Sequence, residues 1–149
     1  MYRKYGDRVR FLTLYIKEAH PEDEWQMESN AKDRDNVCYK QPRTTDERVA
    51  IANDFVQRFH YEIPMAVDPI ENPANAAYAG WPERFYIVDE KGVIAYKGKP
   101  GPFGYHPEEV EAWLASRFPS ETAPSKSSRN SLRLFQRYTR IAALTASRR

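Results

Sequence analysis

The fold is decided by residues 81–97, which read WPERFYIVDEKGVIAYK. Two runs rich in apolar and β-branched residues, 84–88 and 93–97, are joined by the turn-forming residues 89–92, so we expect an antiparallel hairpin. Pro82 stands at the start of the first run, where a residue without an N–H removes no bond from the interior of a sheet. The sequence therefore predicts a strand that begins directly after Trp81-Pro82.

Outward from this hairpin, strand-like and helix-like segments alternate. Residues 9–16 form a nearly continuous apolar run, as expected for a central strand that is covered on both faces. The polar segment 17–43 is long enough to suggest a functional loop. The other expected elements are the end of a helix at 2–7, a helix at 46–60, a strand at 63–67, a short helix or turn at 74–79 and a helix at 107–118.

Helical spacing also predicts which side of the helix at 46–60 is buried. Thr44 or Thr45 can cap this helix, and the acidic residues that follow suit its positive end. The apolar residues recur at intervals of three and four and define the expected buried face: Val49, Ala52, Phe55, Val56 and Phe59.

Composition narrows the class of protein. The chain has 149 residues, of which 41% are hydrophobic and 30% charged, values typical of one globular domain with a tail. It has no apolar run of about 18 residues that could span a membrane as a helix. The single cysteine, Cys38, excludes an internal disulfide and a multi-cysteine zinc site. It suits a reducing compartment, so we predict a cytoplasmic protein; three separated histidines predict no metal site.

Charge divides the chain into two parts. Residues 1–119 carry a net charge of −4 and residues 120–149 a net charge of +6, and a Pro/Ser-rich stretch marks the change. We predict a compact domain at 1–118, a flexible linker at 119–130 and a basic tail at 131–149. Because the positive charge is confined to the tail, a nucleic-acid-binding domain surface is not supported.

The tail has a helical pattern of its own. Apolar and arginine residues fall on different faces, which indicates a basic amphipathic helix that could contact an acidic membrane or a partner. The simpler alternative is a weakly ordered extension. The residues of the apolar face are Leu134, Phe135, Tyr138, Ile141 and Ala142, and those of the basic face are Arg133, Arg137 and Arg140.

Four blocks resemble the iodothyronine deiodinase family, in the family's order. They are YIKEAHPEDEW at 15–25, PERFYI at 82–87, YKGKPGPFGY at 96–105 and PEEV at 107–110. The resemblance implies a thioredoxin-like α/β fold and reductive removal of iodine from an iodinated aromatic ring. It also implies an external thiol reductant and no bound cofactor.

The family's nucleophile is a selenocysteine or cysteine in the loop after its first strand, which would lie upstream of Met1. The chain is thus expected to be a thioredoxin-like domain that lacks its first strand and most of its first helix, with a C-terminal basic tail. The strand at 9–16 would then lose a neighbour, so we expect an exposed sheet edge and low stability. The fold also predicts a cis peptide bond between Trp81 and Pro82.

Three residues are the expected catalytic groups. His20, at the end of the strand segment, can deliver a proton to the carbon that loses iodine, and Glu18 can orient it or accept a proton. Arg84 can pair with a phenolate, although an ion pair with a nearby acid is the simpler interpretation. Cys38 is expected to have no role. The aromatic pocket is expected to include Trp25, Trp81, Pro82 and Tyr105, although aromatic side chains in an α/β domain more often belong to the core.

Two other interpretations stay open. One is a thioredoxin- or peroxiredoxin-like thiol reductase, and the other is a catalytically inactive thioredoxin-fold module that binds a partner. The family's thyroid-hormone enzymes carry a further histidine in the loop after the Glu-Ala-His block, whereas residues 39–43 contain none, so the substrate is open. A homodimer is compatible with the sequence.

Overall fold

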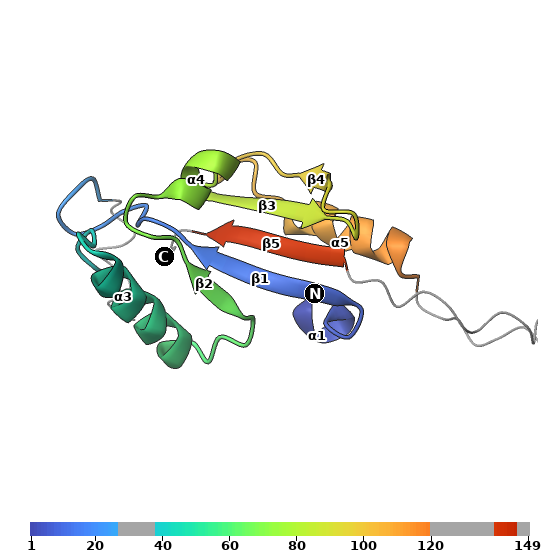
Figure 1. The fold of residues 1–149 in the computed structure, drawn as a ribbon, viewed down its shortest axis with the longest axis horizontal. Helices are drawn as coiled ribbons and strands as arrows, with labels where there is room; N and C mark the ends of the chain where they lie inside the picture. The colour runs from blue at the N-terminus through green and yellow to red at the C-terminus, as the bar shows by residue number, and fades with distance from the viewer. Residues whose placement is uncertain (27–37, 120–138, 146–149) are drawn as a thin grey trace, which may run out of the picture.

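The chain folds into one mixed α/β sheet structure, which confirms the predicted fold class at that level (Figure 1). A computed structural model describes residues 1–26, 38–119 and, for the backbone alone, 139–145. None of the helices in these ranges has the length and apolar character that crossing a membrane requires. The elements are α1 (Tyr2–Tyr5), β1 (Val9–Tyr15), α3 (Thr45–Arg58), β2 (Met65–Val67), α4 (Pro73–Tyr78), β3 (Glu83–Val88), β4 (Ile94–Lys97), α5 (Pro107–Arg117) and β5 (Thr139–Thr145).

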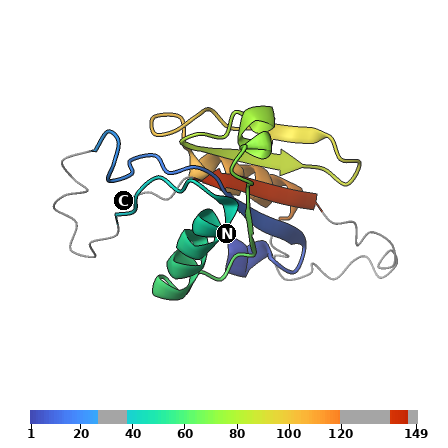
Figure 2. The same ribbon diagram turned by 60° about the vertical axis from the view of Figure 1, so that its left-hand side comes forward.

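The five strands form a single sheet in the order β2-β1-β5-β3-β4. β2, β1 and β5 are parallel, and β3 runs antiparallel to both β5 and β4. α3 lies at the β2 edge of the sheet and α5 lies next to β3 (Figures 1 and 2). The sheet is therefore built from the whole length of the chain, with its last strand in the middle.

β5 corrects two expectations. Within the predicted helical tail, residues 139–145 form a strand, so the helix prediction is wrong there. β1 pairs with β2 on one side and β5 on the other, so the predicted exposed edge is also wrong. The physical reason is non-local: a short isolated helix is marginal in water, whereas two unpaired strand edges offer hydrogen bonds along a whole segment. The predicted linker after Pro119 lies outside the described residues.

The predicted hairpin is confirmed as β3 and β4. Asp89 stabilises the turn because its Oδ1 accepts hydrogen bonds from the backbone N–H groups of Lys91 and Val93, each at 2.9 Å. Gly92 has a φ of +84°, a left-handed conformation that favours glycine. The peptide bond between Trp81 and Pro82 is cis, as predicted.

Two hydrophobic clusters pack against the sheet, and the larger one holds helices on it. The larger joins α1, β1, β3 and α5, which places α1 and α5 on the same face. The smaller joins Ile16, Ala19 and Tyr86, with Leu14 packed against them. Side chains alternate along a strand, so neighbouring residues of β3 contribute to different faces. The residues of the larger cluster are Tyr5, Val9, Phe85, Ile87, Val110 and Leu114.

The buried face of α3 differs from the predicted one. Thr44 caps the helix as expected, since its Oγ1 accepts a hydrogen bond from the N–H of Glu47 at 3.2 Å. Ala52 is buried, but Val49 is 37% exposed and Arg48 is buried in its place. A helical face rotated by one residue brings an arginine inside, which hydrophobic periodicity alone cannot anticipate.

Candidate functional site

A buried carboxyl lies where β1 ends. Glu18 is only 6% exposed, and its Oε1 accepts a hydrogen bond from the hydroxyl of Tyr15, the last residue of β1. Burial raises the pKa of the Glu18 carboxyl to about 8, against the opposing effect of the nearby Arg48 guanidinium. At neutral pH, Glu18 is therefore mostly protonated and can donate a proton.

The backbone of Glu18 is held from two sides. The Gln41 side chain accepts a hydrogen bond from the Glu18 N–H at 3.1 Å and donates one to its carbonyl at 3.3 Å. The indole Nε1 of Trp81 donates to the same carbonyl at 3.4 Å. Lys17 lies over the Trp81 ring, 5.2 Å from its centroid. The loop before α3 and the segment before β3 thus meet at the end of β1.

Arg48 is the residue that sequence reasoning missed. It is 1% exposed, and its Nη1 donates hydrogen bonds of 2.8 Å to the carbonyls of Asp68 and Pro69. The only signal in the sequence is its spacing of four from Ala52, which puts both on one helical face. Because most arginines lie at the surface, this spacing alone does not indicate a buried cation.

Asp68 connects this cation to the backbone. Its carboxylate accepts hydrogen bonds from the N–H groups of Ala74 at 3.0 Å and Asn75 at 2.8 Å, at the start of α4. Its own N–H donates to the carbonyl of Tyr15 at 2.9 Å. β1, α3 and α4 are therefore joined by one polar network, which reaches Glu18 through Tyr15.

His20 follows Glu18 and is half-buried. Its ring packs edge-on against Trp25, with ring centroids 4.7 Å apart, and its carbonyl accepts a hydrogen bond from Gln26 at 2.6 Å. Its Nδ1 is buried and has no hydrogen-bond partner among the residues that the structure describes. Trp25 itself is 69% exposed, so it covers the histidine rather than filling a core position.

Arg84 is buried at the start of β3. Its Nη1 lies 3.5 Å from the hydroxyl of Tyr86, which in turn donates to the carbonyl of Tyr78. No carboxylate in the described ranges pairs with Arg84, so the simpler ion-pair interpretation is not supported there. The structure gives no contact between Arg84 and Glu18. The cation that lowers the pKa of the Glu18 carboxyl is Arg48.

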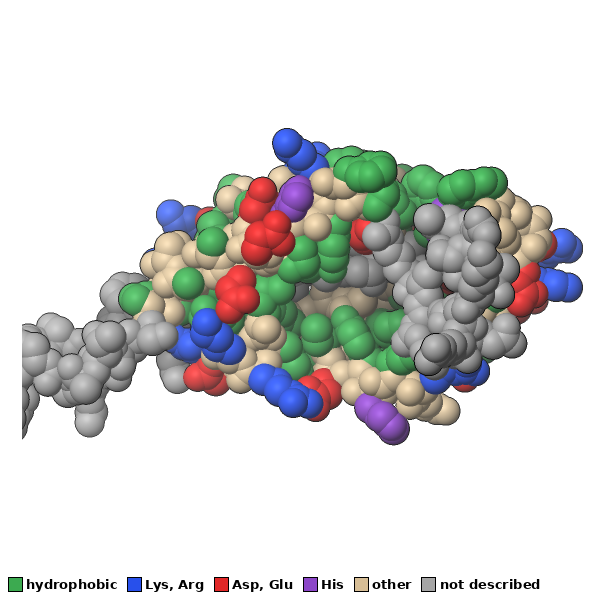
Figure 3. All heavy atoms as spheres, turned by 180° about the vertical axis from the view of Figure 1, so that it is seen from behind, with side chains coloured by type: hydrophobic (Ala, Val, Ile, Leu, Met, Phe, Trp, Pro, Cys, Tyr) green, Lys and Arg blue, Asp and Glu red, His purple; other side chains and the backbone are tan. Residues whose placement is uncertain are grey.

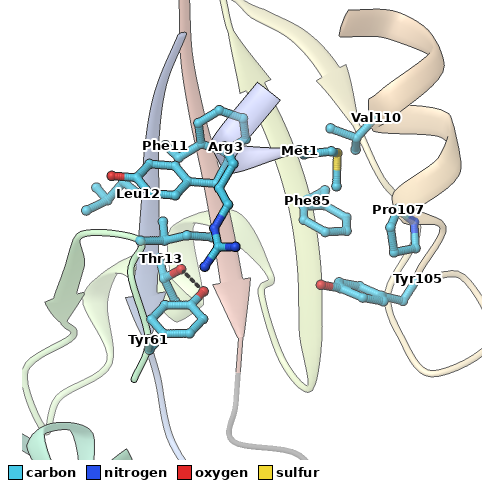
Figure 4. Close-up of a pocket in the computed structure, with 12 residues that line it drawn as sticks. Met1, Arg3, Phe11, Leu12, Thr13, Tyr61, Phe85, Tyr105, Pro107 and Val110 are labelled. Carbon is cyan, nitrogen blue, oxygen red and sulfur yellow. Dashed lines mark hydrogen bonds between the residues drawn. The ribbon is translucent and has the colours of Figure 1, made fainter. Parts of the chain in front are cut away.

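Tyr105 lies in a different environment from Glu18. Its ring stacks on Phe85, with centroids 4.5 Å apart, and both line an apolar cavity of about 420 Å³ between α1 and α5 (Figure 4). Tyr61 lines the opposite side, and its hydroxyl is 2.6 Å from that of Thr13. Seen from behind, the molecule is hollowed and hydrophobic side chains line the hollow (Figure 3). Thr13, which lines this cavity, and Tyr15 face the same side of β1.

Cys38 is connected to the backbone of His20 through the side chain of Gln26. Its Sγ is 3.9 Å from the Oε1 of Gln26, the residue whose side chain donates to the His20 carbonyl. The thiol is half-buried. Among the described residues, no group of three or more histidine, cysteine or acidic side chains could hold a metal ion.

Comparison with known proteins identifies the family. A family model described as iodothyronine deiodinase matches residues 1–118, a range that includes every site residue discussed above. The type I iodothyronine deiodinase of Xenopus laevis is 42% identical over 100 residues, which are 67% of this chain and 36% of that protein. The thyroxine 5-deiodinase of Bos taurus is 36% identical over 111 residues, 74% of this chain and 35% of that protein.

The type II iodothyronine deiodinase of Rattus norvegicus is similar too. It is 37% identical over 110 residues, which are 72% of this chain and 40% of that protein. The chain thus spans a little over a third of the length of these relatives. The chain belongs to the iodothyronine deiodinase family.

Proposed function

We propose that the protein takes part in the reductive removal of iodine from an iodinated aromatic compound such as an iodothyronine, with a thiol as reductant. Family membership supports this reaction class. The observation that carries the proposal is the buried, protonated Glu18 beside His20 at the end of β1. A carboxyl that keeps its proton at neutral pH is suited to general acid catalysis.

The reaction needs a nucleophile, a proton and a reductant. A thiolate or selenolate takes iodine from the ring, the carbon–iodine electron pair stays on the carbon, and a proton from the site forms the new C–H bond. The sulfenyl or selenenyl iodide then reacts with one thiol, releases iodide and a proton, and forms a mixed disulfide or selenenyl sulfide. A second thiol regenerates the nucleophile and leaves the oxidised reductant as a disulfide.

The described residues supply the proton and charge parts of this scheme. We assign proton delivery to His20 with Glu18, because the His20 Nδ1 is unpartnered in the described part and Glu18 is protonated. Arg84 would stabilise the phenolate oxygen of the substrate. Trp25, Trp81 and Pro82 would form the aromatic wall nearest these groups, and Tyr105 would line the adjoining apolar cavity.

We also propose that the nucleophile lies outside these 149 residues. In this proposal the domain is thioredoxin-like, without the first strand and most of the first helix that carry the nucleophile loop. Two observations support it. The antiparallel hairpin of β3 and β4 is followed by α5, in the same sheet as β1, and the four sequence blocks resemble the family. In this arrangement the nucleophile would approach the edge of the sheet at which β1 ends with Tyr15 and β3 begins with Glu83.

Iodide release is the direct test. The protein is expressed from a coding sequence that is extended upstream, in frame, far enough to include the proposed first strand and nucleophile loop. Iodide release from an iodothyronine is then measured with dithiothreitol as the thiol reductant. Thiol-dependent release that is lost in the His20→Ala variant supports the proposal. Absence of release by a folded extended protein, or unrelated sequence upstream, would reject it in favour of an inactive binding module.

A thiol reductase is the second candidate, because Cys38 is linked through Gln26 to the backbone of His20. In that case Cys38 would be the nucleophile, and the protein would reduce disulfides or peroxides. Reduction of insulin disulfides or hydrogen peroxide by the 149-residue chain, abolished by Cys38→Ser, would establish this alternative. Activity that survives this substitution would exclude it.

A further inference from the structure

A closed ring of hydrogen-bonded residues includes the end of β1. The carbonyl of Tyr15 accepts a hydrogen bond from the N–H of Asp68, whose carboxylate accepts one from the N–H of Asn75. The side chain of Asn75 accepts a hydrogen bond from the N–H of Trp81, whose indole Nε1 donates to the carbonyl of Glu18. The Glu18 carboxyl accepts the hydroxyl of Tyr15, which closes the ring. Asn75 is thus the link between the polar network at Asp68 and the aromatic side chain of Trp81.

Both the backbone and the side chain of Asn75 are bonded. It lies half-buried in the first turn of α4, beside the start of β3, where its N–H donates to the Asp68 carboxylate at 2.8 Å (Figure 1). Its carbonyl accepts hydrogen bonds from the N–H of Ala79 and, at 3.2 Å, from that of Gly80. Its Oδ1 accepts the N–H of Trp81 at 3.0 Å. One residue therefore holds the whole turn that leads from α4 to Trp81.

This turn needs such support. Ala79 has a φ of +47°, a left-handed conformation that residues with a Cβ adopt rarely. Such a conformation persists where the surrounding contacts determine it. In the part of the chain that the structure describes, Asn75 supplies contacts to three successive N–H groups, those of residues 79–81. The last of these three contacts is the one that depends on the identity of the side chain.

Trp81 is the group through which Asn75 reaches the candidate site. Its side chain is 43% exposed, so packing alone does not fix the ring. The indole is oriented by its hydrogen bond to the Glu18 carbonyl at 3.4 Å and by the Lys17 ammonium, 5.2 Å from the ring centroid. Both contacts depend on where the backbone of Trp81 lies, and the Asn75 side chain binds that backbone directly.

We propose that Asn75 is a positioning residue of the candidate site: it holds the Trp81 indole beside Glu18 and so fixes the aromatic wall against which an iodinated ring binds. The use of that wall rests on the proposed function, whereas the positioning of Trp81 does not. Asn75 touches no reacting atom and acts through Trp81. Loss of its acceptor oxygen should weaken substrate binding more than it slows proton delivery, which is assigned to His20 with Glu18.

The indole N–H signals of the 149-residue chain test the positioning directly. The chain has three tryptophans, and a Trp81→Phe variant identifies the Trp81 signal in NMR spectra of the isotope-labelled protein. Asn75→Leu keeps the shape of the side chain without its acceptor. We expect the Trp81 indole signal to move and its N–H to exchange with water several-fold faster. The signals of Trp25 and Trp113 are internal controls and should stay in place.

Asn75→Asp is the matched variant for rescue. It keeps an acceptor oxygen, and aspartate suits the first turn of a helix, so the wild-type Trp81 signal should return. A Trp81 signal that stays unchanged in Asn75→Leu, or that moves equally in Asn75→Asp, would overturn the proposal. If Asn75→Leu does not fold, the wild-type chain decides. Its Trp81 backbone N–H should exchange more slowly than the same amide in a short peptide, and an unprotected amide would contradict the proposal.

Kinetics of the upstream-extended protein test the consequence for the substrate. Asn75→Leu should raise the KM for an iodothyronine several-fold and change kcat less, because the proton groups stay in place. An unchanged KM, or an equal loss in kcat, would overturn the role of the Trp81 wall. Absence of iodide release by the wild type would instead count against the proposed function, and the NMR spectra would still decide whether Asn75 positions Trp81.

Discussion

Residues 1–118 and the segment that follows them contribute different things to this protein. The first region matches the deiodinase family and contains Glu18, His20 and Arg84, the groups to which the proposed chemistry is assigned. The second region has the opposite net charge and supplies β5, the central strand of the sheet. The proposed site and the central strand of the sheet therefore come from separate parts of the chain, and each can be perturbed without changing the sequence of the other.

The largest effect is expected when β5, which the second region supplies, is disrupted. Ala142→Pro removes a backbone donor in the middle of a strand that is paired on both sides, a place from which proline is essentially excluded, and the acceptor left without its donor alone costs about 1–3 kcal/mol. We expect loss of the cooperative thermal transition measured by circular dichroism. Ser127→Pro, in the predicted linker, is the control and should melt like the wild type. An unchanged melting curve for Ala142→Pro would mean that β5 does not hold the sheet together.

The next effect concerns the chemistry of the first region. In the upstream-extended protein, His20→Ala and Arg84→Ala should each reduce iodide release strongly while circular dichroism stays unchanged. Loss of a positioned proton donor such as His20 typically lowers the rate by roughly 10²–10⁴. Cys38→Ser is the comparison and should change the rate little. If the Cys38 variant is dead and the His20 variant is fully active, the site assignment is wrong.

A smaller effect is expected in the pH dependence of stability. The folded-state pKa of Glu18 is about 8, above the ordinary value of 4.5, so the unfolded chain loses its proton first. Stability should therefore decrease as pH rises from about 4.5 to 8, by roughly 2–3 kcal/mol between pH 5 and pH 7. Urea unfolding of the wild type and Glu18→Gln at pH 5, 7 and 9 measures this contribution. The variant should lack that decrease; parallel profiles would show that Glu18 is ionised in the folded protein.

The smallest effect sharpens the role of Arg48. If protonated Glu18 is needed for the reaction, iodide release decreases at the pH at which Glu18 ionises. Arg48→Met removes the cation that opposes the raised pKa of Glu18, so this decrease should move to higher pH. It also leaves the carbonyls of Asp68 and Pro69 without their donor, at a cost of about 1–3 kcal/mol. Arg48→Lys keeps the charge and is the matched control for the pH profile. A profile that moves equally in both variants would argue for a purely structural role.

The sequence by itself was sufficient to predict most of the helices and strands of residues 1–118. Hydrophobic periodicity predicts β1, α3, β3 and α5, and the turn residues around Gly92 predict the hairpin, because these signals depend on nearby residues. The block around Glu18 and His20 likewise indicates the family and the end of β1. Local patterns are informative where an element's neighbours in sequence determine its conformation.

Only the tertiary structure determined the conformation of residues 139–145, the burial of Arg48 and the raised pKa of Glu18. Residues 139–145 have a pattern compatible with a helix, and they form β5 because β1 and β3 leave a slot whose backbone groups need partners. Arg48 is buried because of how α3 lies against its neighbours, and the proton on Glu18 at neutral pH is a consequence of burial. Strand pairing and desolvation both depend on residues distant in sequence, which is the physical reason why neither could be derived from the local pattern.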